Sequence, residues 1–172
     1  MTDWLKSKAM VHFIGSFYSP LEFGHVIIVS GKVSENAEIF TLNFLADKNC
    51  YEVPLQIHVK FGDDEQIIRN SKINGELGTA ETESAFNYKE KNPLKSGDIN
   101  CVIDFFYQKD KKKCLFKNWF FLYIIGSNFI FYVLIGLDRF HISINNIHFC
   151  DYIFRSSLKQ IIMCEVILNT YL

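Results

Sequence analysis

Histidine, cysteine and carboxylate side chains usually carry a protein's chemistry, and here they are scattered without a recognisable catalytic pattern. No two cysteines form a C-x-x-C pair, and their wide spacing fits neither a zinc site nor a disulfide framework; they are Cys50, Cys101, Cys114, Cys150 and Cys164. We expect small buried thiols in a reducing compartment instead. The histidines that show no metal-ligand spacing are His12, His25, His141 and His148.

Three further kinds of site find no support in the sequence: a calcium site, a phosphate-binding loop and a nucleophilic catalytic set. The acidic run Asp63-Asp64-Glu65 falls in an expected loop, where solvated carboxylates are more common than a calcium site. There is no glycine-rich phosphate-binding loop, and no Ser/His/Asp or Cys/His set stands in a context that would bring it together. The sequence therefore predicts a protein that is not an enzyme and that holds no metal or cofactor.

The composition narrows the class of protein further. The chain has 172 residues with 18 Lys and Arg against 19 Asp and Glu, so it lacks the basic surplus of a nucleic-acid binder. Hydrophobic residues make up 49% and charged residues 22%, which argues against disorder and allows one domain with a real core. The 16% of aromatic residues favours strands.

The elements that must position any site are short strands joined by polar turns. Alternating or β-branched patterns predict strands at 25–33, 38–44, 52–61, 66–71, 100–106, 139–144, 148–149 and 165–169. Asn74-Gly75 and Asn145-Asn146 are turn signals, and the second would let His141 and His148 face each other on paired strands. Residues 80–95 are polar and are expected to form a loop. No long amphipathic helix is evident, so an all-β sandwich or jelly roll is predicted.

One stretch does not fit this pattern. After a lysine run, Trp119 to Leu137 carries no charge and approaches the length of a membrane-spanning helix. An apolar β-hairpin, or a loop packed on the sandwich, explains the same residues, and Gly126-Ser127-Asn128 in the middle is a reasonable turn.

In sequence order, several segments resemble the galectins, the β-galactoside-binding lectins, and are most similar to those of nematodes. These segments are 19–33, 40–44, 55–58, 67–71, 92–97, 138–149 and 165–169. The resemblance implies a galectin-type jelly-roll β-sandwich of two antiparallel sheets, with a shallow sugar groove on one concave face. It covers a domain at 15–172 after an N-terminal extension at 1–14, interrupted by an apolar insertion at about 111–135.

The insertion can be explained in more than one way. A membrane span between two strands of one sandwich would place the closing strands on the far side of the bilayer, so membrane insertion by Trp119–Leu137 is disfavoured. The family strand pattern would rejoin smoothly if Gln108-Lys109 ran into Asp138-Arg139. Residues between them could therefore be translated intron sequence.

The resemblance also implies a set of sugar-binding residues. His58 matches the family's sugar-binding histidine and Asn70 its strand asparagine. Lys60 stands where the family's arginine could be, although the Asn and Pro that precede that arginine have no counterpart. The family's stacking tryptophan is Leu77 here, and the second glutamate of its motif survives as Glu81.

Other parts of that motif are lost, because the family's first glutamate is Ala80 and its arginine is Thr82. One stacking aromatic contributes roughly 0.5–1.5 kcal/mol beyond its buried area. Each charge-assisted hydrogen bond contributes about 1.5–3 kcal/mol. Together these losses exceed the roughly 4 kcal/mol that a millimolar affinity represents. The sequence therefore predicts weak or altered binding of β-galactoside-type glycans.

Two functions follow from these observations. The first is a lectin whose partners are glycans or glycoproteins. The alternative is a protein-interaction module on the same fold that has lost sugar binding, with a protein partner. The N-terminus shows no signal peptide, and the resemblance implies a cytoplasmic protein, an extracellular one exported by a route that needs no signal peptide, or both.

Overall fold

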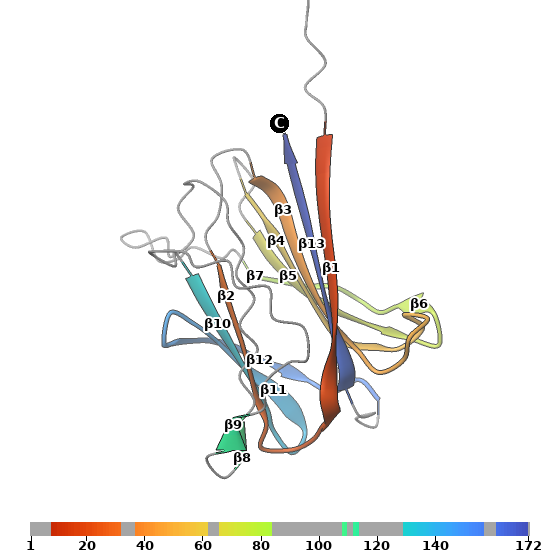
Figure 1. Cartoon of the computed structure of the whole chain (residues 1–172), viewed down its shortest axis with the longest axis vertical. Helices are drawn as coiled ribbons and strands as arrows, with labels where there is room; N and C mark the ends of the chain where they lie inside the picture. Colours follow the sequence, from red (N-terminus) through yellow and green to blue (C-terminus); the bar gives the residue numbers. More distant parts are fainter. Residues whose placement is uncertain are drawn as a thin grey trace, which may run out of the picture.

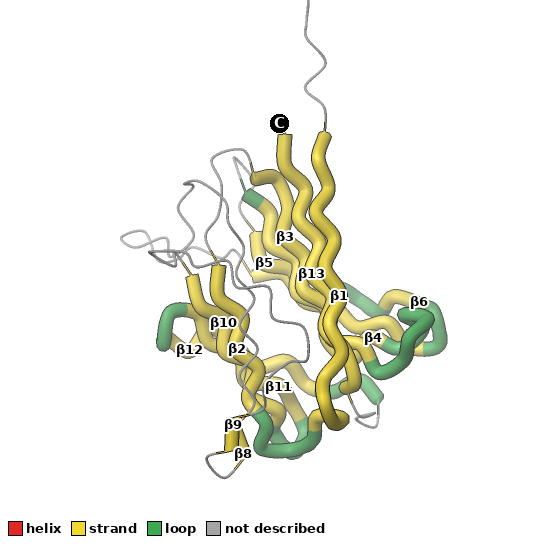
Figure 2. The backbone as a smooth tube through the Cα atoms, in the orientation of Figure 1, coloured by secondary structure: helices red, strands yellow, loops and turns green. Residues whose placement is uncertain are grey.

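The computed structural model describes residues 8–31, 37–61, 66–83, 108–109, 112–113, 129–156 and 161–171. Every regular element in these ranges is a β-strand, and the strands form two main antiparallel sheets that face each other (Figures 1 and 2). The all-β sandwich that the sequence predicted is confirmed.

The larger sheet, called sheet A here, has seven strands. Its order is β1 (Lys8–Leu21), β13 (Ile161–Tyr171), β3 (Ala37–Leu45), β4 (Val53–Lys60), β5 (Gln66–Ile73) and β6 (Glu76–Leu77), while β7 (Glu81–Glu83) also pairs with β5. Strands β1 and β13 run side by side along the length of the molecule (Figure 1).

The smaller sheet, called sheet B here, has four strands. Its order is β12 (Ile147–Ile153), β11 (Arg139–Ile144), β10 (Phe129–Ile135) and β2 (Val26–Gly31). A separate two-stranded ribbon pairs β8 (Gln108–Lys109) with β9 (Lys112–Lys113).

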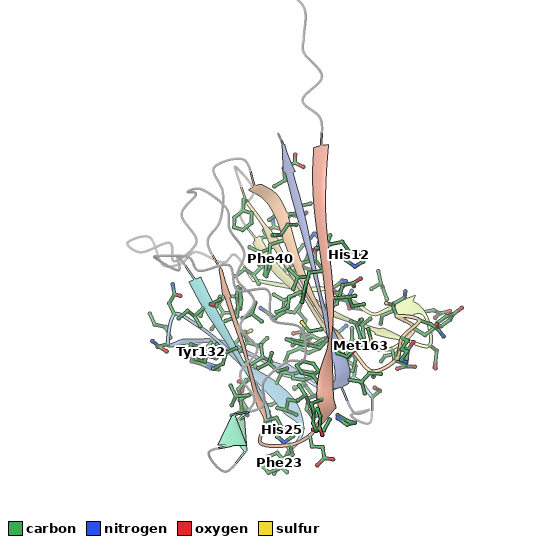
Figure 3. All side chains as sticks on the ribbon, in the orientation of Figure 1. His12, Phe23, His25, Phe40, Tyr132 and Met163 are labelled. Atoms are coloured by element: carbon green, nitrogen blue, oxygen red, sulfur yellow. The ribbon has the colours of Figure 1, made fainter. Side chains whose placement is uncertain are left out.

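The core lies between the two sheets, and it follows from the alternation of side chains along each strand. In β4, every second residue is buried, because successive side chains of a strand point to opposite faces. Sheet A contributes side chains such as Phe40, Leu42 and Ile57, and sheet B contributes Phe131 and others. Phe40 and Phe131 stack across the core with ring centroids 6.2 Å apart, and Figure 3 marks Phe40. This burial supplies the main stabilisation of the sandwich.

Two hairpin turns fall where the sequence placed them. Asn74 and Gly75 have φ of 53° and 85° between β5 and β6, and Asn145 and Asn146 have φ of 51° and 65° between β11 and β12. Tight hairpins need positive φ at these positions, which Asn and Gly adopt most easily.

Three segments differ from the sequence expectation. Residues 8–14, assigned above to an N-terminal extension, belong to β1 and pair with β13. Residues 81–83, expected to lie in a loop, form β7. Residues 129–135, the last part of the expected apolar insertion, are a strand between β11 and β2 whose side chains Phe131, Val133 and Ile135 are buried in the core. That part is therefore integral to the sandwich, and a rejoining of Lys109 to Asp138 would remove it.

Several sequence expectations lie outside the described residues: the strand at 100–106, the Asp63-Asp64-Glu65 run, the segment at 92–97 and most of the uncharged stretch before β10. Within the described ranges, no helix has the length and apolar character that crossing a bilayer requires. Of the cysteines placed there, Cys150 and Cys164 are buried and Cys50 is half-buried, and none of these three is in a disulfide.

Candidate functional site

The residues that the sequence proposed for sugar binding lie on β4, β5, β6 and β7 of sheet A. On β4 the core side carries Leu55, Ile57 and Val59, so Gln56, His58 and Lys60 share the opposite, outward face. His58 and Lys60 are therefore brought together on one surface, as the strand period requires.

His58 is held in place by its neighbour on β3. Thr41 lies opposite His58 in the strand register, and Thr41 Oγ1 and His58 Nδ1 form a hydrogen bond of 2.8 Å. Burial, followed by the positive charge of Lys60, holds the pKa of His58 below its usual value of 6.5. The imidazole is consequently neutral near pH 7, and its Nε2 makes no hydrogen bond to any described residue.

A chain of polar side chains continues across the same face, from β4 to β1. Gln56 Nε2 donates to Asn43 Oδ1 at 2.9 Å, and Asn43 Nδ2 donates to Glu165 Oε2 at 2.6 Å. The other oxygen of Glu165 lies 2.7 Å from Nε2 of His12, which Figure 3 labels on β1. Four strands are joined by this chain.

Asn70 lies opposite Gln56 in the register, but its amide is used within the protein. Its Nδ2 donates to the Gly78 carbonyl at 3.0 Å, and its Oδ1 accepts from the Ser71 backbone N–H at 2.8 Å and from Arg155 Nη1 at 3.0 Å. Only 8% of Asn70 is exposed. A ligand would therefore have to compete with these bonds.

Glu81 lies on the other side of sheet A from His58. It pairs in register with Arg69, which is buried against the core, whereas the next residue, Thr82, pairs with Ile68, the cross-strand neighbour of His58. Glu81 Oε1 accepts from Arg155 Nη2 at 2.9 Å, and Glu81 Oε2 lies 3.8 Å from Arg69 Nη2. The structure thus places Glu81, whose side chain is 43% exposed, in an ion-pair cluster with Arg69 and Arg155.

Leu77 ends the short strand β6 and is 62% exposed. Ala80 and Thr82, at the positions of the family's glutamate and arginine, are also exposed and carry no charge. At the positions where the family has an aromatic ring and an ion pair, this chain therefore has the aliphatic side chain of Leu77 and the hydroxyl of Thr82.

Sequence reasoning missed three residues that organise this surface: Asn43, Glu165 and Arg155. Each bonds to a residue on another strand, and Arg155 reaches Asn70 from 85 positions away in the sequence. The alternation within β3 signals that Asn43 faces away from the core. No local signal pairs Arg155 with Asn70, because that contact depends on how the two sheets pack.

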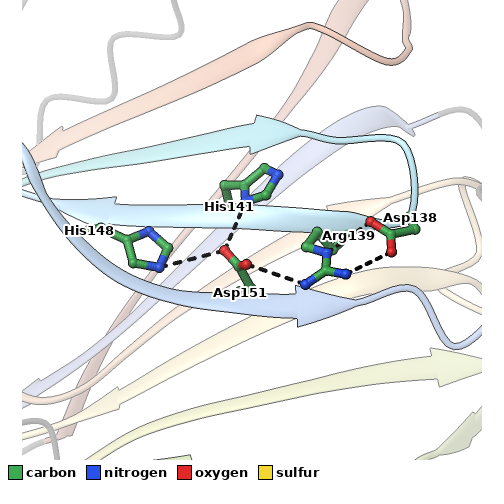
Figure 4. Close-up of polar contacts among 5 residues, drawn as sticks. All are labelled: Asp138, Arg139, His141, His148 and Asp151. Carbon is green, nitrogen blue, oxygen red and sulfur yellow. Dashed lines mark hydrogen bonds and ion pairs between the residues drawn. The ribbon is translucent and has the colours of Figure 1, made fainter.

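A second polar cluster lies on β11, β12 and the turn before β11 (Figure 4). Asp151 Oδ1 lies 2.8 Å from His141 Nδ1 and 3.6 Å from His148 Nε2, and Arg139 pairs with both Asp138 and Asp151. Burial acts to raise the pKa of Asp151, but the hydrogen bond and charge of His141, the charge of His148 and the hydrogen bond of Arg139 lower it overall. Among the residues that the structure describes, no group of three His, Cys, Asp or Glu side chains is arranged to hold a metal.

Comparison with known proteins agrees with this architecture. The family model for galactoside-binding lectins matches residues 12–168. A 32 kDa beta-galactoside-binding lectin of Haemonchus contortus is 31% identical over 98 residues, which are 55% of this chain and 32% of that protein. The chain thus matches about a third of the length of this relative.

Solved galectin structures share the fold at low sequence identity. Xenopus laevis galectin-Ib superposes with a TM-score of 0.62 at 16% identity, covering 91% of this chain and 92% of that one. Sheep galectin-11, solved in complex with glycerol, superposes with a TM-score of 0.60 at 12% identity and covers 92% of both chains. These are lectins and not enzymes. Because the family model spans most of the sequence and the sandwich matches galectin structures, the chain belongs to the galactoside-binding lectin family, the galectins.

Proposed function

We propose that the outward face of sheet A around His58 binds glycans of the β-galactoside type, with weak affinity and altered specificity. The observation that supports this most is the state of His58. Its Nδ1 is fixed by Thr41 and its Nε2 is left for a ligand hydroxyl. A neutral imidazole presented in this way can donate or accept one directional hydrogen bond.

Lys60 and Gln56 flank His58 on the same face and add donors that suit sugar hydroxyls. Leu77 offers an aliphatic contact in place of an aromatic plate. Because the aromatic ring and the groove-side ion pair are absent, we expect dissociation constants of about 1 mM or weaker for simple β-galactosides.

The proposal can be tested with a glycan array on the purified protein, followed by calorimetric titration with lactose. We expect weak signals that His58→Ala abolishes and that lactose displaces. His148→Ala, on the outer face of sheet B, is the matched control and should leave binding unchanged. Leu77→Trp should tighten binding by about tenfold, the equivalent of one stacking interaction.

A second candidate is a protein-interaction module that has lost its sugar. It is favoured by the internal use of the Asn70 amide and by the outward position of Leu77. This candidate would replace the lectin proposal if the glycan array gave no signal and a protein partner bound regardless of lactose and of His58→Ala. Binding gained only with Leu77→Trp would mean a galectin scaffold whose sugar site has been lost.

A further inference from the structure

Arg155 links the two sheets at the edge of the candidate site. It follows β12 of sheet B, and its guanidinium reaches two residues of sheet A. Nη1 donates to Asn70 Oδ1 at 3.0 Å, and Nη2 donates to Glu81 Oε1 at 2.9 Å. The guanidinium carbon also lies 5.0 Å from the ring centroid of Tyr152. Three partners thus fix one planar cation, and a fork of parallel donors is suited to bridge them.

Asn70 passes this constraint to the segment after Leu77. Its Nδ2 donates to the Gly78 carbonyl at 3.0 Å, and the Gly78 N–H donates to the Ser71 carbonyl at 2.9 Å. Both backbone groups of Gly78 are therefore bonded to β5. The orientation of the Asn70 amide decides which of its ends faces the Gly78 carbonyl. The NH₂ end can donate to that carbonyl, whereas the oxygen end cannot.

Gly78 shows how closely Arg155 approaches this segment. A Cβ added to Gly78 would lie 2.6 Å from Arg155 Nη1 and 3.3 Å from Asn70 Oδ1. The Gly78 backbone is not in the left-handed region, since positive φ among glycines is confined to Gly24 and Gly75 in the described chain. A Cβ at 78 would therefore have to push the Arg155 guanidinium aside and crowd Asn70, although the backbone there is not strained.

We infer that Arg155 is a positioning residue for the candidate sugar site. Its positive charge, together with the Ser71 backbone N–H, selects the oxygen end of the Asn70 amide. The NH₂ end is then left to hold Gly78, which fixes Leu77. Its link to sugar binding rests on the function proposed above, but the positioning itself does not. This role requires both arms of the guanidinium, because a lysine at 155 could serve Asn70 or Glu81 but not both.

The first test needs no ligand. Nuclear magnetic resonance of the ¹⁵N-labelled protein reports the Asn70 side-chain amide and the Gly78 backbone amide. In Arg155→Met we expect both signals to shift and the Gly78 amide to exchange with solvent about tenfold faster, because its neighbour loses a charge-assisted bond. Arg155→Lys should restore the signals in part. Arg139→Met, which removes an arginine from the cluster of Figure 4, should leave them unchanged.

Gly78→Ala provides an independent variant in case Arg155→Met does not fold. Its Cβ should displace the guanidinium and reproduce the shift of the Asn70 amide signal. In the Arg155→Met background, Gly78→Ala should change that signal little further, since the group it displaces is already gone. Unchanged Asn70 signals in a folded Arg155→Met or Gly78→Ala protein would overturn the inference.

The second test measures sugar binding. In the Leu77→Trp background, Arg155→Met should weaken lactose binding about tenfold, with partial rescue by Arg155→Lys. If no variant binds any glycan, the proposed function fails while the resonance experiment still decides the role of Arg155. If lactose binding is tight and indifferent to residue 155, the positioning role in binding is wrong although the lectin function stands.

Discussion

Glu165 on β13 and Asn43 on β3 are cross-strand partners, and the carboxylate of the first accepts a hydrogen bond of 2.6 Å from the amide of the second. The same carboxylate contacts His12 on β1 through its other oxygen. One acidic side chain thus connects three neighbouring strands of sheet A on the face that carries His58. Because Asn43 is only 6% exposed, its amide depends on this partner and on Gln56.

Replacement of Glu165 should therefore destabilise the folded protein. We expect Glu165→Ala to lower the free energy of unfolding by about 1–3 kcal/mol, because the amide of Asn43 is left without its charged acceptor. His12→Ala removes only a half-exposed partner and should cost less than about 1 kcal/mol. Urea unfolding of both variants provides the comparison. Equal losses of unfolding free energy in the two variants would show that the Glu165–Asn43 hydrogen bond is not the main contribution of Glu165 to stability.

The contribution of strand β10 to stability can be tested with substitutions at two neighbouring residues. Ile135 is fully buried in the core, while Leu134 on the opposite face is 36% exposed. We expect Ile135→Ala to destabilise the protein by about 2–5 kcal/mol, since it leaves a cavity, and Leu134→Ala to cost clearly less. Thermal and urea unfolding measure both. Similar small effects would mean that residues 129–135 are dispensable, as an inserted segment would be.

The low pKa of His58 gives a pH dependence with a definite sign. The cause is chiefly burial, then Lys60, so the folded protein binds this proton less readily than the unfolded chain, whose histidine titrates near 6.5. The stability from neutral His58 is present above about pH 6.5 and is lost as the pH falls below that value.

His58→Gln should therefore flatten the dependence of unfolding free energy on pH between about pH 7 and 5. His148→Gln, on sheet B, controls for the removal of a histidine as such. An unaltered slope in His58→Gln would contradict this assignment of the proton.

A comparison of two glycines with left-handed backbone separates the cost of backbone strain from the cost of steric crowding at the Cβ position. Gly24 has φ of +83° with open space at its Cβ position, whereas Gly75 has φ of +85° and its Cβ would lie 3.1 Å from the ring of Tyr51. Alanine at either site should cost about 1–2 kcal/mol for the backbone. Gly75→Ala should cost more than Gly24→Ala, and Tyr51→Ala should remove the excess. Equal costs in the melting curves would show that the Tyr51 ring moves aside freely.

The sequence was informative wherever one face of a strand is buried and the other is polar. In β4 the alternation marks both the core face and the face of His58, and the Asn74-Gly75 and Asn145-Asn146 turns follow from backbone chemistry. Strand β10 was hidden because its outward residues, Tyr132 and Leu134, are as apolar as its buried ones. A uniform apolar run cannot be distinguished from other buried segments by periodicity.

The candidate site was predictable only in its local parts. Spacing along β4 places His58 beside Lys60, because the strand period is two. The ion-pair role of Glu81 was not predictable, since it depends on the pairing of β7 with β5 and on Arg155 reaching it from the end of β12 in sheet B. A motif position can therefore keep its residue type while facing away from the candidate site.

The pairing of β1 with β13 has a consequence for how the chain reaches this structure. His12 and Glu165 are in contact although 153 positions separate them, and β3 also depends on β13 for one of its two neighbours. On the ribosome, β1 and that edge of β3 must wait until residues 161–171 emerge, so sheet A closes only after that segment has been synthesised. Long-range contacts of this kind make folding slow, in the millisecond-to-second range typical of β-sandwiches. During that wait, exposed strand edges are the points at which nascent chains would associate, and a chaperone that covers β1 would protect them.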